Sequence, residues 1–236
     1  MLFRSAVGIP VIGSLNCISV GGWMEYSRKL QEAGADALEL NLYFIPTNPN
    51  LDAASIEKLY FDALQEVKKT VTIPIAVKLS PYFTNLSQMI TALDKKGANG
   101  IALFNRFYQP DLNLENLSVE PGVVLSNSSD LRLPLRWIAI MYGKVNASLA
   151  GTGGVHTASD ALKMIAAGAD VAHLCAAILK NGPEHLGKML KEMEEWLVRK
   201  EYKSLGQLKG SLSQKSVAEP AEFERANYMK AINDYR

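Results

Sequence analysis

An internal two-strand repeat is the feature of this 236-residue sequence that most narrows its fold. The second half of each repeat contains an amphipathic helix, a Gly, an Ala, an Asp or Asn, and a short apolar strand. A glycine at this point can adopt the left-handed conformation that ends a helix and turns the chain into a strand. These halves are EAGADALEL at 32–40, KKGANGIAL at 95–103 and AAGADVAHL at 166–174, with their turns at Gly34, Gly97 and Gly168.

The first half of each repeat is a strand as well: IPVIGSLN at 9–16, IPIAVKLS at 73–80 and VNASLAGTGG at 145–154. Three copies of the unit therefore predict six strands. Because these strands are nearly continuous apolar runs that alternate with helices, they indicate a parallel sheet covered by helices. We expect the strands near residues 11–16, 37–42, 75–80, 100–105, 147–151 and 171–175.

The predicted fold class is α/β, a (β/α)8 TIM barrel of which about six of the eight βα units lie in this chain. The segment LFRSAVGIP at 2–10 resembles LQEVKKTVTIP at 64–74, a helix end that leads into a strand. We therefore expect the chain to begin inside the second βα unit of a larger barrel. An open six-stranded, doubly wound sheet is the alternative fold. We predict a barrel domain over residues 1–211.

Residues 212–236 form a predicted C-terminal helical extension, with a helix after Pro220. This helix either covers an exposed face, joins a subunit interface or lies free on the surface.

Composition narrows the classes of function. The formal net charge is +1, so the chain has no basic field that would attract nucleic acid or a membrane surface, and a small-molecule substrate is favoured. Cys17 and Cys175 lie in apolar runs without metal-ligand spacing, which predicts buried, reduced thiols of a cytoplasmic protein and no metal site. Gly8, Pro10 and Gly13 interrupt the apolar start, so neither a signal peptide nor a membrane span is predicted.

Polar or Gly-rich residues end five of the six predicted strands, where a barrel places its chemistry. Lys78 interrupts an otherwise apolar strand, and a buried ammonium group needs an acceptor. Glu39 lies on the same strand face as Asn41 and is one partner for Lys78; alternatively, Lys78 points at an electron-rich ring or an anion. Asn16 alone fits a residue that merely terminates its strand. The strand ends are Asn16, Asn41, Lys78 with Ser80, Asn105 with Arg106, and Gly151–Gly154.

The segment GTGGV at 151–155 predicts a phosphate site. Its glycines allow backbone N–H groups to approach an oxyanion, and the helix that follows begins with Thr157 and Asp160 at the spacing of a capping box. The predicted last strand ends at Cys175-Ala176-Ala177. Barrels of this kind bind phosphate with the loops after their last two strands, so position and motif agree.

In these segments the sequence resembles the dihydroorotate dehydrogenase family, over about residues 9–211. ELNLYFIPTNPN at 39–50 is similar to the family's ELN-x-S-C-P-N segment, and VKLSPYF at 77–83 to its VKL-x-P-Y stretch. LFNR at 103–106 stands where the family has an Asn that contacts substrate and flavin. GTGGV stands at the family's phosphate site, and EYKSLGQLKGSL at 201–212 resembles its closing helix.

The resemblance implies an FMN-dependent oxidoreductase of pyrimidine biosynthesis that acts on dihydroorotate or a related planar substrate. Carried over by position, it implies substrate binding by two asparagines and flavin binding by residues of four segments. It also implies that a bulky residue at Gly154 abolishes flavin retention while the fold stays intact. The implied substrate-binding residues are Asn41 and Asn105, and the implied cofactor-binding residues are Lys78, Asn105, Gly153, Gly154, Cys175 and Ala176.

Two positions depart from the family pattern. Tyr43-Phe44-Ile45-Pro46 occupies the place of the family's Cys or Ser base, so the catalytic residue is left unassigned, and LCAAI at 174–178 replaces a Gly-Thr pair. Because the family's N-terminal quarter also has no counterpart, we expect weak or no activity from this chain alone. The alternatives are a non-redox phosphate-binding barrel enzyme and a non-catalytic partial barrel. The resemblance also allows the protein to form a homodimer.

Overall fold

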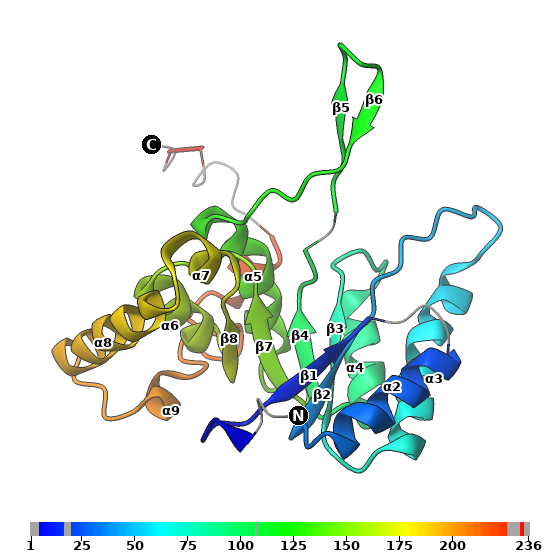
Figure 1. The fold of residues 1–236 in the computed structure, drawn as a ribbon. Coiled ribbons are helices and arrows are strands. Elements are labelled where there is room, and N and C mark those ends of the chain that lie inside the picture. Colours follow the sequence, from blue (N-terminus) through cyan, green and yellow to red (C-terminus); the bar gives the residue numbers. More distant parts are fainter. Residues whose placement is uncertain (1–4, 17–19, 107, 226–231, 234–236) are drawn as a thin grey trace. The chain divides into compact units, whose positions relative to one another are not determined.

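The computed structural model describes residues 5–16, 20–106, 108–225 and 232–233. The chain divides into two compact units (Figure 1). Unit 1 comprises Met1–Asn105 and Met141–Ala150, and unit 2 comprises Arg106–Ile140 and Gly151–Arg236.

Unit 1 consists of parallel strands that alternate with helices (Figure 1). Strands β1 to β4 pair in chain order, each parallel to the next, and β7 follows β4 in the sheet. The six predicted strands and the α/β alternation of a partial (β/α)8 barrel are confirmed. The elements are β1 (Ile12–Leu15), α2 (Val20–Glu32), β2 (Ala37–Asn41), α3 (Ala53–Thr70), β3 (Ile75–Leu79), α4 (Leu86–Lys95), β4 (Gly100–Leu103) and β7 (Ser148–Thr152).

The two faces of the unit 1 sheet differ in side-chain size. Successive residues of a strand point to opposite faces. On the face that α3 and α4 cover, large aliphatic side chains such as Leu40, Val77 and Ile101 are fully buried. The opposite face carries small or polar residues, among them Ala76 and Ala102. Large aliphatic side chains therefore pack on one face of the sheet, and the other face carries the polar residues of the strands.

The repeat glycines form the predicted turns, with φ of 89° at Gly34, 87° at Gly97 and 123° at Gly168. At each turn the glycine N–H donates to the carbonyl three residues back, and the next N–H donates to the carbonyl five residues back. This Schellman pattern satisfies the last carbonyls of the helix. The bonds are Gly34 N to Gln31 O, Ala35 N to Leu30 O, Gly97 N to Asp94 O, Ala98 N to Leu93 O, Gly168 N to Ile165 O and Ala169 N to Met164 O.

The Asp or Asn that follows each turn in unit 1 joins neighbouring strands. Asp36 Oδ2 accepts from Val11 N at 2.7 Å, and Asn99 Oδ1 accepts from Ile75 N at 3.0 Å. In each case the side chain satisfies the N–H at the start of the preceding strand of the sheet. The Gly-Ala-Asp/Asn motif therefore ends a helix and sets the register of the next strand.

Unit 2 contains the remaining helices and the glycine-rich loop at residues 151–155. Leu162 and Ile165 of helix α6 form a buried apolar cluster with Leu208, and Trp196 and Tyr202 pack against this cluster. The rings of Trp196 and Tyr202 are stacked with centroids 5.7 Å apart. The elements are η1 (Ser128–Leu131), α5 (Arg132–Met141), α6 (Ala158–Ala167), β8 (Val171–His173), α7 (Ala176–Asn181), α8 (Glu184–Arg199), α9 (Leu205–Leu208) and η2 (Pro220–Phe223).

The C-terminal segment returns to the helices of unit 2. Leu212 N donates to Ala166 O, and Gln214 N donates to Ala139 O. Pro220–Phe223 form the 3-10 turn η2, and most of the helix predicted after Pro220 lies outside the described residues.

Sequence patterns missed a pair of short strands and misjudged the burial of a cysteine. A two-stranded ribbon, β5 (Asp111–Asn113) with β6 (Ser118–Glu120), was not predicted. Cys175 was expected to be buried, but it is a free, exposed thiol, because β8 ends at His173 and Cys175 lies at the N-terminus of α7. Cys17 lies outside the described residues. Among the helices that the structure describes, none has the length and apolar character needed to cross a membrane.

Candidate functional site

Three polar side chains form a charge-neutral group on the small-residue face of unit 1. Lys78 Nζ lies 3.4 Å from Glu39 Oε1, and Ser14 Oγ donates to the same oxygen at 2.9 Å. The register explains the contact, because Ser14 pairs with Glu39 across β1 and β2. The Lys78 side chain is 21% exposed and that of Glu39 is 10% exposed. The ion pair considered from the sequence is thus present, and part of the ammonium group remains accessible.

The two predicted substrate asparagines lie beside Lys78. Asn41 is the register partner of Lys78, and Asn105 Nδ2 lies 3.4 Å from both Lys78 O and Leu42 O. Asn41, Lys78 and Asn105 therefore come together at the C-terminal ends of β2 to β4, as expected from the sequence.

One atom of this group lacks a partner. Among the described residues, no group hydrogen-bonds to the buried Oδ1 of Asn41. A buried acceptor without a donor costs about 1–3 kcal/mol. Such an atom fits a site in which a ligand N–H supplies the missing donor. We call Glu39, Asn41, Lys78 and Asn105 the strand-end cluster.

The other predicted strand ends contribute fewer side chains to the candidate site than the strand-end cluster does. Asn16 is exposed at the end of β1. Ser80 is buried and its Oγ accepts from Tyr82 N at 3.3 Å, so it shapes the turn after β3. In the loop after β2, Phe44 and Ile45 are 38% and 46% exposed. Residues 43–46 of that loop offer a phenol and apolar groups.

The glycine-rich loop of unit 2 is shaped for the backbone to approach a ligand. Gly153 and Gly154 have φ of 95° and 78°, which glycine adopts without strain. A Cβ at Gly153 would meet no atom within 4 Å, so there is open space beside it. The ten-residue helix α6 begins shortly after, and its N-terminal dipole favours an anion. The loop therefore fits a phosphate group.

Gly154 is in close contact with the protein instead. A Cβ there would overlap the backbone N and Cα of Leu131. The expectation that a bulky residue at Gly154 leaves the fold intact is therefore wrong, because such a residue must displace η1.

Asp160 holds the glycine loop in place. It is 4% exposed, and its Oδ2 accepts from Ser128 Oγ at 2.8 Å and from Thr157 N and Oγ1 at 3.0 Å each. His156 N donates to the same oxygen at 3.2 Å. Burial alone would raise the pKa of Asp160, but these hydrogen bonds outweigh it and hold the pKa below its ordinary value. The predicted capping box of Thr157 and Asp160 is present.

The segment before α5 packs around this loop, which sequence patterns did not indicate. Ser126 Oγ lies 3.0 Å from His156 Nε2, and Lys180 Nζ donates to Ser126 O at 2.7 Å. Asn127 and Asp130 form a second capping box. The spacing of Asn127 and Asp130 was the available signal for this turn. Cys175 and Ala176, the other predicted phosphate residues, lie at the start of α7.

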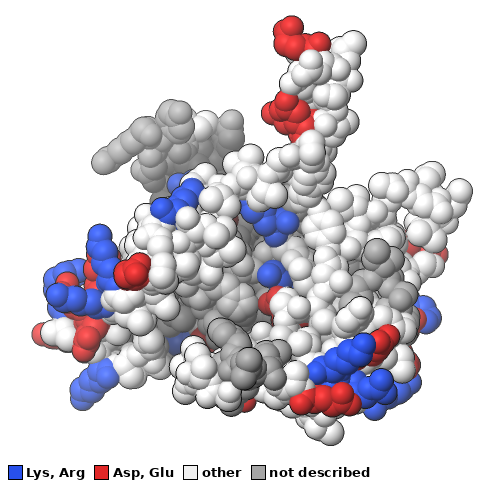
Figure 2. Space-filling view, viewed as in Figure 1, with Lys and Arg blue, Asp and Glu red and all other residues white. Residues whose placement is uncertain are grey.

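Charge on the surface is mixed. Figure 2 shows basic and acidic groups side by side, in keeping with ion pairs such as Lys29 with Glu25 on α2 and Lys188 with Glu192 on α8. Exposed charges that are further apart than the Debye length, roughly 10 Å at 0.1 M salt, are largely screened from each other. Within the described residues, no group of three or more His, Cys, Asp or Glu side chains is arranged to hold a metal ion.

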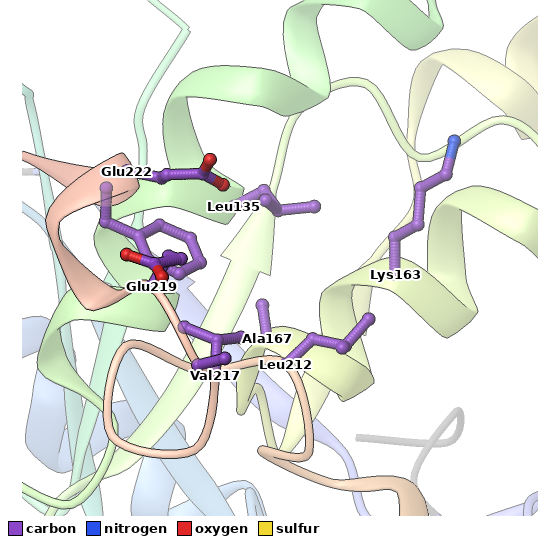
Figure 3. A pocket seen from close by; sticks show the side chains of 9 residues that line it. Leu135, Lys163, Ala167, Leu212, Val217, Glu219 and Glu222 are labelled. Atoms are coloured by element: carbon purple, nitrogen blue, oxygen red, sulfur yellow. The ribbon is translucent and has the colours of Figure 1, made fainter. Parts of the chain in front are cut away.

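A cavity of about 690 Å³ lies elsewhere in unit 2, between α5, α6 and the C-terminal segment. Leu135, Ala167 and Leu212 form apolar walls, and Glu219 and Glu222 lie along one side (Figure 3). It contains none of the residues predicted for the site, so we do not assign the site to it.

Comparison with known proteins gives a consistent result. Residues 3–197 match the family model described as dihydroorotate dehydrogenase. The chain is 27% identical over 214 residues to the "Dihydroorotate dehydrogenase B (NAD(+)), catalytic subunit" of Endomicrobium trichonymphae, a match that covers 88% of this chain and 68% of the relative. Proteins of the same name from Thermoplasma acidophilum and Caldicellulosiruptor bescii are each 25% identical, over 86% and 89% of this chain and 68% and 71% of theirs.

Proposed function

Because the chain belongs to the dihydroorotate dehydrogenase family, we propose that it is an FMN-dependent oxidoreductase that acts on dihydroorotate or a related planar substrate. The observation that carries this proposal is the unpartnered, buried Oδ1 of Asn41 beside the accessible part of Lys78. A ring N–H of a planar substrate would supply the missing donor. Bound FMN would accept a hydride, and the protein would supply position and proton transfer.

In this proposal the strand-end cluster binds both rings. Asn41 and Asn105 hold the substrate, and Lys78 and Asn105 contact the flavin. Glu39 and Ser14 keep Lys78 in place, with its ammonium group 3.4 Å from Glu39 Oε1. A cation held among small residues such as Ala76 and Ala102 can act on an electron-rich ring more strongly than it would in water.

The phosphate of the cofactor is assigned to unit 2. Gly153 and Gly154 would present backbone N–H groups to it, and Cys175 and Ala176 would do the same from the start of α7. No hydroxyl is required at these positions, so the replacement of a Gly-Thr pair by LCAAI is compatible with phosphate binding.

Proton abstraction is the weak step of the proposed reaction. Tyr43-Phe44-Ile45-Pro46 contains no thiol, serine or imidazole, and loss of a general base costs about 10²–10⁴-fold in rate. We therefore propose that this chain turns over dihydroorotate slowly or not at all.

The test is single-turnover reduction of the bound flavin by dihydroorotate, followed as bleaching of its visible absorbance, in the natural chain and in Phe44→Cys. Slow bleaching that the new thiol accelerates is the expected result. The control is Phe44→Ala, which changes side-chain size without adding a base. Rapid bleaching in the natural chain would show that another group serves as base.

A non-redox enzyme is the second candidate, because the glycine loop could bind the phosphate of a substrate as well as that of FMN. A yellow protein that releases FMN on denaturation supports the first candidate, and a colourless protein that binds phosphate esters supports the second. We further propose that the protein acts in the cytoplasm in pyrimidine biosynthesis. Its working form would be a homodimer or a complex with another subunit, with residues 1–211 as the catalytic domain.

A further inference from the structure

A second cavity of unit 2, of about 400 Å³, lies between α6 and the end of α8. Its floor is formed by Leu162, Ala166 and Leu208, which belong to the buried apolar cluster of α6. Small-molecule sites are concave and mostly apolar, with volumes of roughly 300–1,000 Å³. The cavity contains no residue of the strand-end cluster or of the glycine loop, so the function proposed above leaves it without a role. We call it the α6–α8 cavity.

Two aromatic rings line the α6–α8 cavity. Trp196 and Tyr202 are partly buried, and their stacked rings are inclined to each other by 15°. The turn that ends α8 holds Tyr202 in this position, because Tyr202 N donates to Leu197 O at 2.9 Å. In the same turn Glu201 N donates to Val198 O at 3.0 Å. The stacked pair is therefore a fixed surface against which a planar ring can pack.

The charged side chains that line this cavity are both positive. Lys163 lies on α6 and Lys200 follows α8, and no Asp or Glu is among the described residues that line the cavity. Within the part of the chain that the structure describes, neither lysine forms an ion pair. By contrast, Lys188 and Lys191 on α8 lie 3.8 and 4.0 Å from glutamates of the same helix. Two ammonium groups without a carboxylate partner therefore lie at the edge of an apolar surface.

The neighbouring cavity differs in charge. It shares Lys163 with the α6–α8 cavity, but it also contains Glu219 and Glu222. Figure 3 shows Lys163 on the opposite side of that cavity from both glutamates. An anion would meet two carboxylates there, whereas in the α6–α8 cavity it would meet only ammonium groups. The α6–α8 cavity is therefore the one that suits an acidic ligand.

We propose that the α6–α8 cavity binds a small planar aromatic anion. Its ring would pack against Trp196, Tyr202 and the apolar floor, and its carboxylate, sulfonate or phosphate group would lie beside Lys163 and Lys200. An ammonium group attracts an anion more strongly beside an apolar surface than in bulk water, because the surface excludes water from one side. A ligand without charge would make only the apolar contacts, and an acid without a ring would make only the ionic ones.

The test uses the full chain and two fluorescent probes with the same ring system. Anilinonaphthalene sulfonate carries an acidic group, and N-phenylnaphthylamine is its uncharged counterpart. Fluorescence titration should show that the sulfonate binds roughly three- to tenfold more tightly than the uncharged probe. Because both lysines are exposed, added salt should reduce this preference.

Variants locate the binding in the α6–α8 cavity. Lys163→Gln/Lys200→Gln should weaken binding of the sulfonate roughly three- to tenfold and leave the affinity for the uncharged probe unchanged. Lys200→Gln alone should give part of that loss, because Lys200 lines this cavity and not the neighbouring one. The matched control Lys188→Gln/Lys191→Gln removes the same charge from α8 outside the cavity and should retain binding. Trp196→Leu should weaken binding of both probes roughly fivefold.

Circular dichroism checks that each variant keeps its fold. The proposal is overturned if the natural chain binds both probes equally tightly, which would show a site for uncharged apolar ligands. It is also overturned if Lys163→Gln/Lys200→Gln binds the sulfonate as tightly as the natural chain does, or if Lys188→Gln/Lys191→Gln loses as much affinity as that variant.

Discussion

The candidate site of unit 1 depends on side chains, whereas the candidate site of unit 2 depends on the backbone. The strand-end cluster of unit 1 depends on side chains, namely a partly buried ion pair and two amides at the ends of strands. The glycine loop of unit 2 depends on backbone, because Gly153 and Gly154 have positive φ and Asp160 holds the turn through four donors. Changes of charge should therefore affect unit 1 most, and added volume should affect unit 2 most.

The largest expected effect is on unit 2. Gly154→Ala should lower the free energy of unfolding by roughly 2–5 kcal/mol, because the new Cβ overlaps the Leu131 backbone and φ is 78°. Urea unfolding followed by circular dichroism measures the loss. The control Gly153→Ala has the same kind of backbone but open space, so it should lose roughly 1–2 kcal/mol. Equal losses would show that crowding at Gly154 is unimportant.

The next effect concerns the ion pair of unit 1. Glu39→Gln leaves a mostly buried ammonium without a counter-charge, which should cost about 1–3 kcal/mol, less than a fully buried pair because Lys78 is 21% exposed. Lys78→Met in the Glu39→Gln background should recover part of this loss. A double-mutant cycle from urea unfolding measures the coupling energy. A coupling energy near zero would mean that water solvates the pair. Charge would then contribute less to stability in the strand-end cluster than in the glycine loop of unit 2.

A smaller effect separates the charge of Asp160 from its shape. Asp160→Asn should cost about 1–2 kcal/mol at neutral pH, because donors to a carboxylate become donors to a neutral amide. The pKa of Asp160 is lower in the folded protein than in the unfolded chain. Its contribution is therefore present above the unfolded pKa of about 3.9 and lost as pH falls through the folded pKa. The difference in stability between natural protein and variant should shrink below about pH 4; a constant difference would contradict the assignment.

The smallest effect should follow from Cys175→Ser. Cys175 is exposed, and its side chain makes no capping hydrogen bond. The free energy of unfolding should then change by less than about 0.5 kcal/mol. If the phosphate is bound by backbone groups, flavin retention should also be unchanged, as measured by absorbance after gel filtration. A thiol reagent should label residue 175 in the folded natural chain. It should leave residue 175 unlabelled in the variant, where serine replaces the thiol. Loss of flavin in Cys175→Ser would show that a side chain contributes to this half of the phosphate site.

Short sequence motifs predicted the fold most successfully. The three Gly-Ala-Asp/Asn turns located helix ends and strand starts, because a positive φ and a capping side chain are needed within a few residues of each other. The same reasoning located the capping box at Thr157 and Asp160. It failed for Cys175, whose apolar neighbours suggested burial, and for the ribbon, whose strands have three residues each.

The sequence by itself determined the parallel β/α order, the positions of its turns, and the meeting of Asn41, Lys78 and Asn105, since parallel strands end at one edge of the sheet. Three features depended on the tertiary structure alone. Ser14 and Lys78 both contact Glu39. Gly154 is crowded whereas Gly153 is open, and Ser126 and Ser128 support the glycine loop. The physical reason is the separation along the sequence of the residues that are in contact. Turns and caps depend on neighbours in the chain, whereas these contacts join residues 23 to 39 positions apart and exist only once the chain has packed.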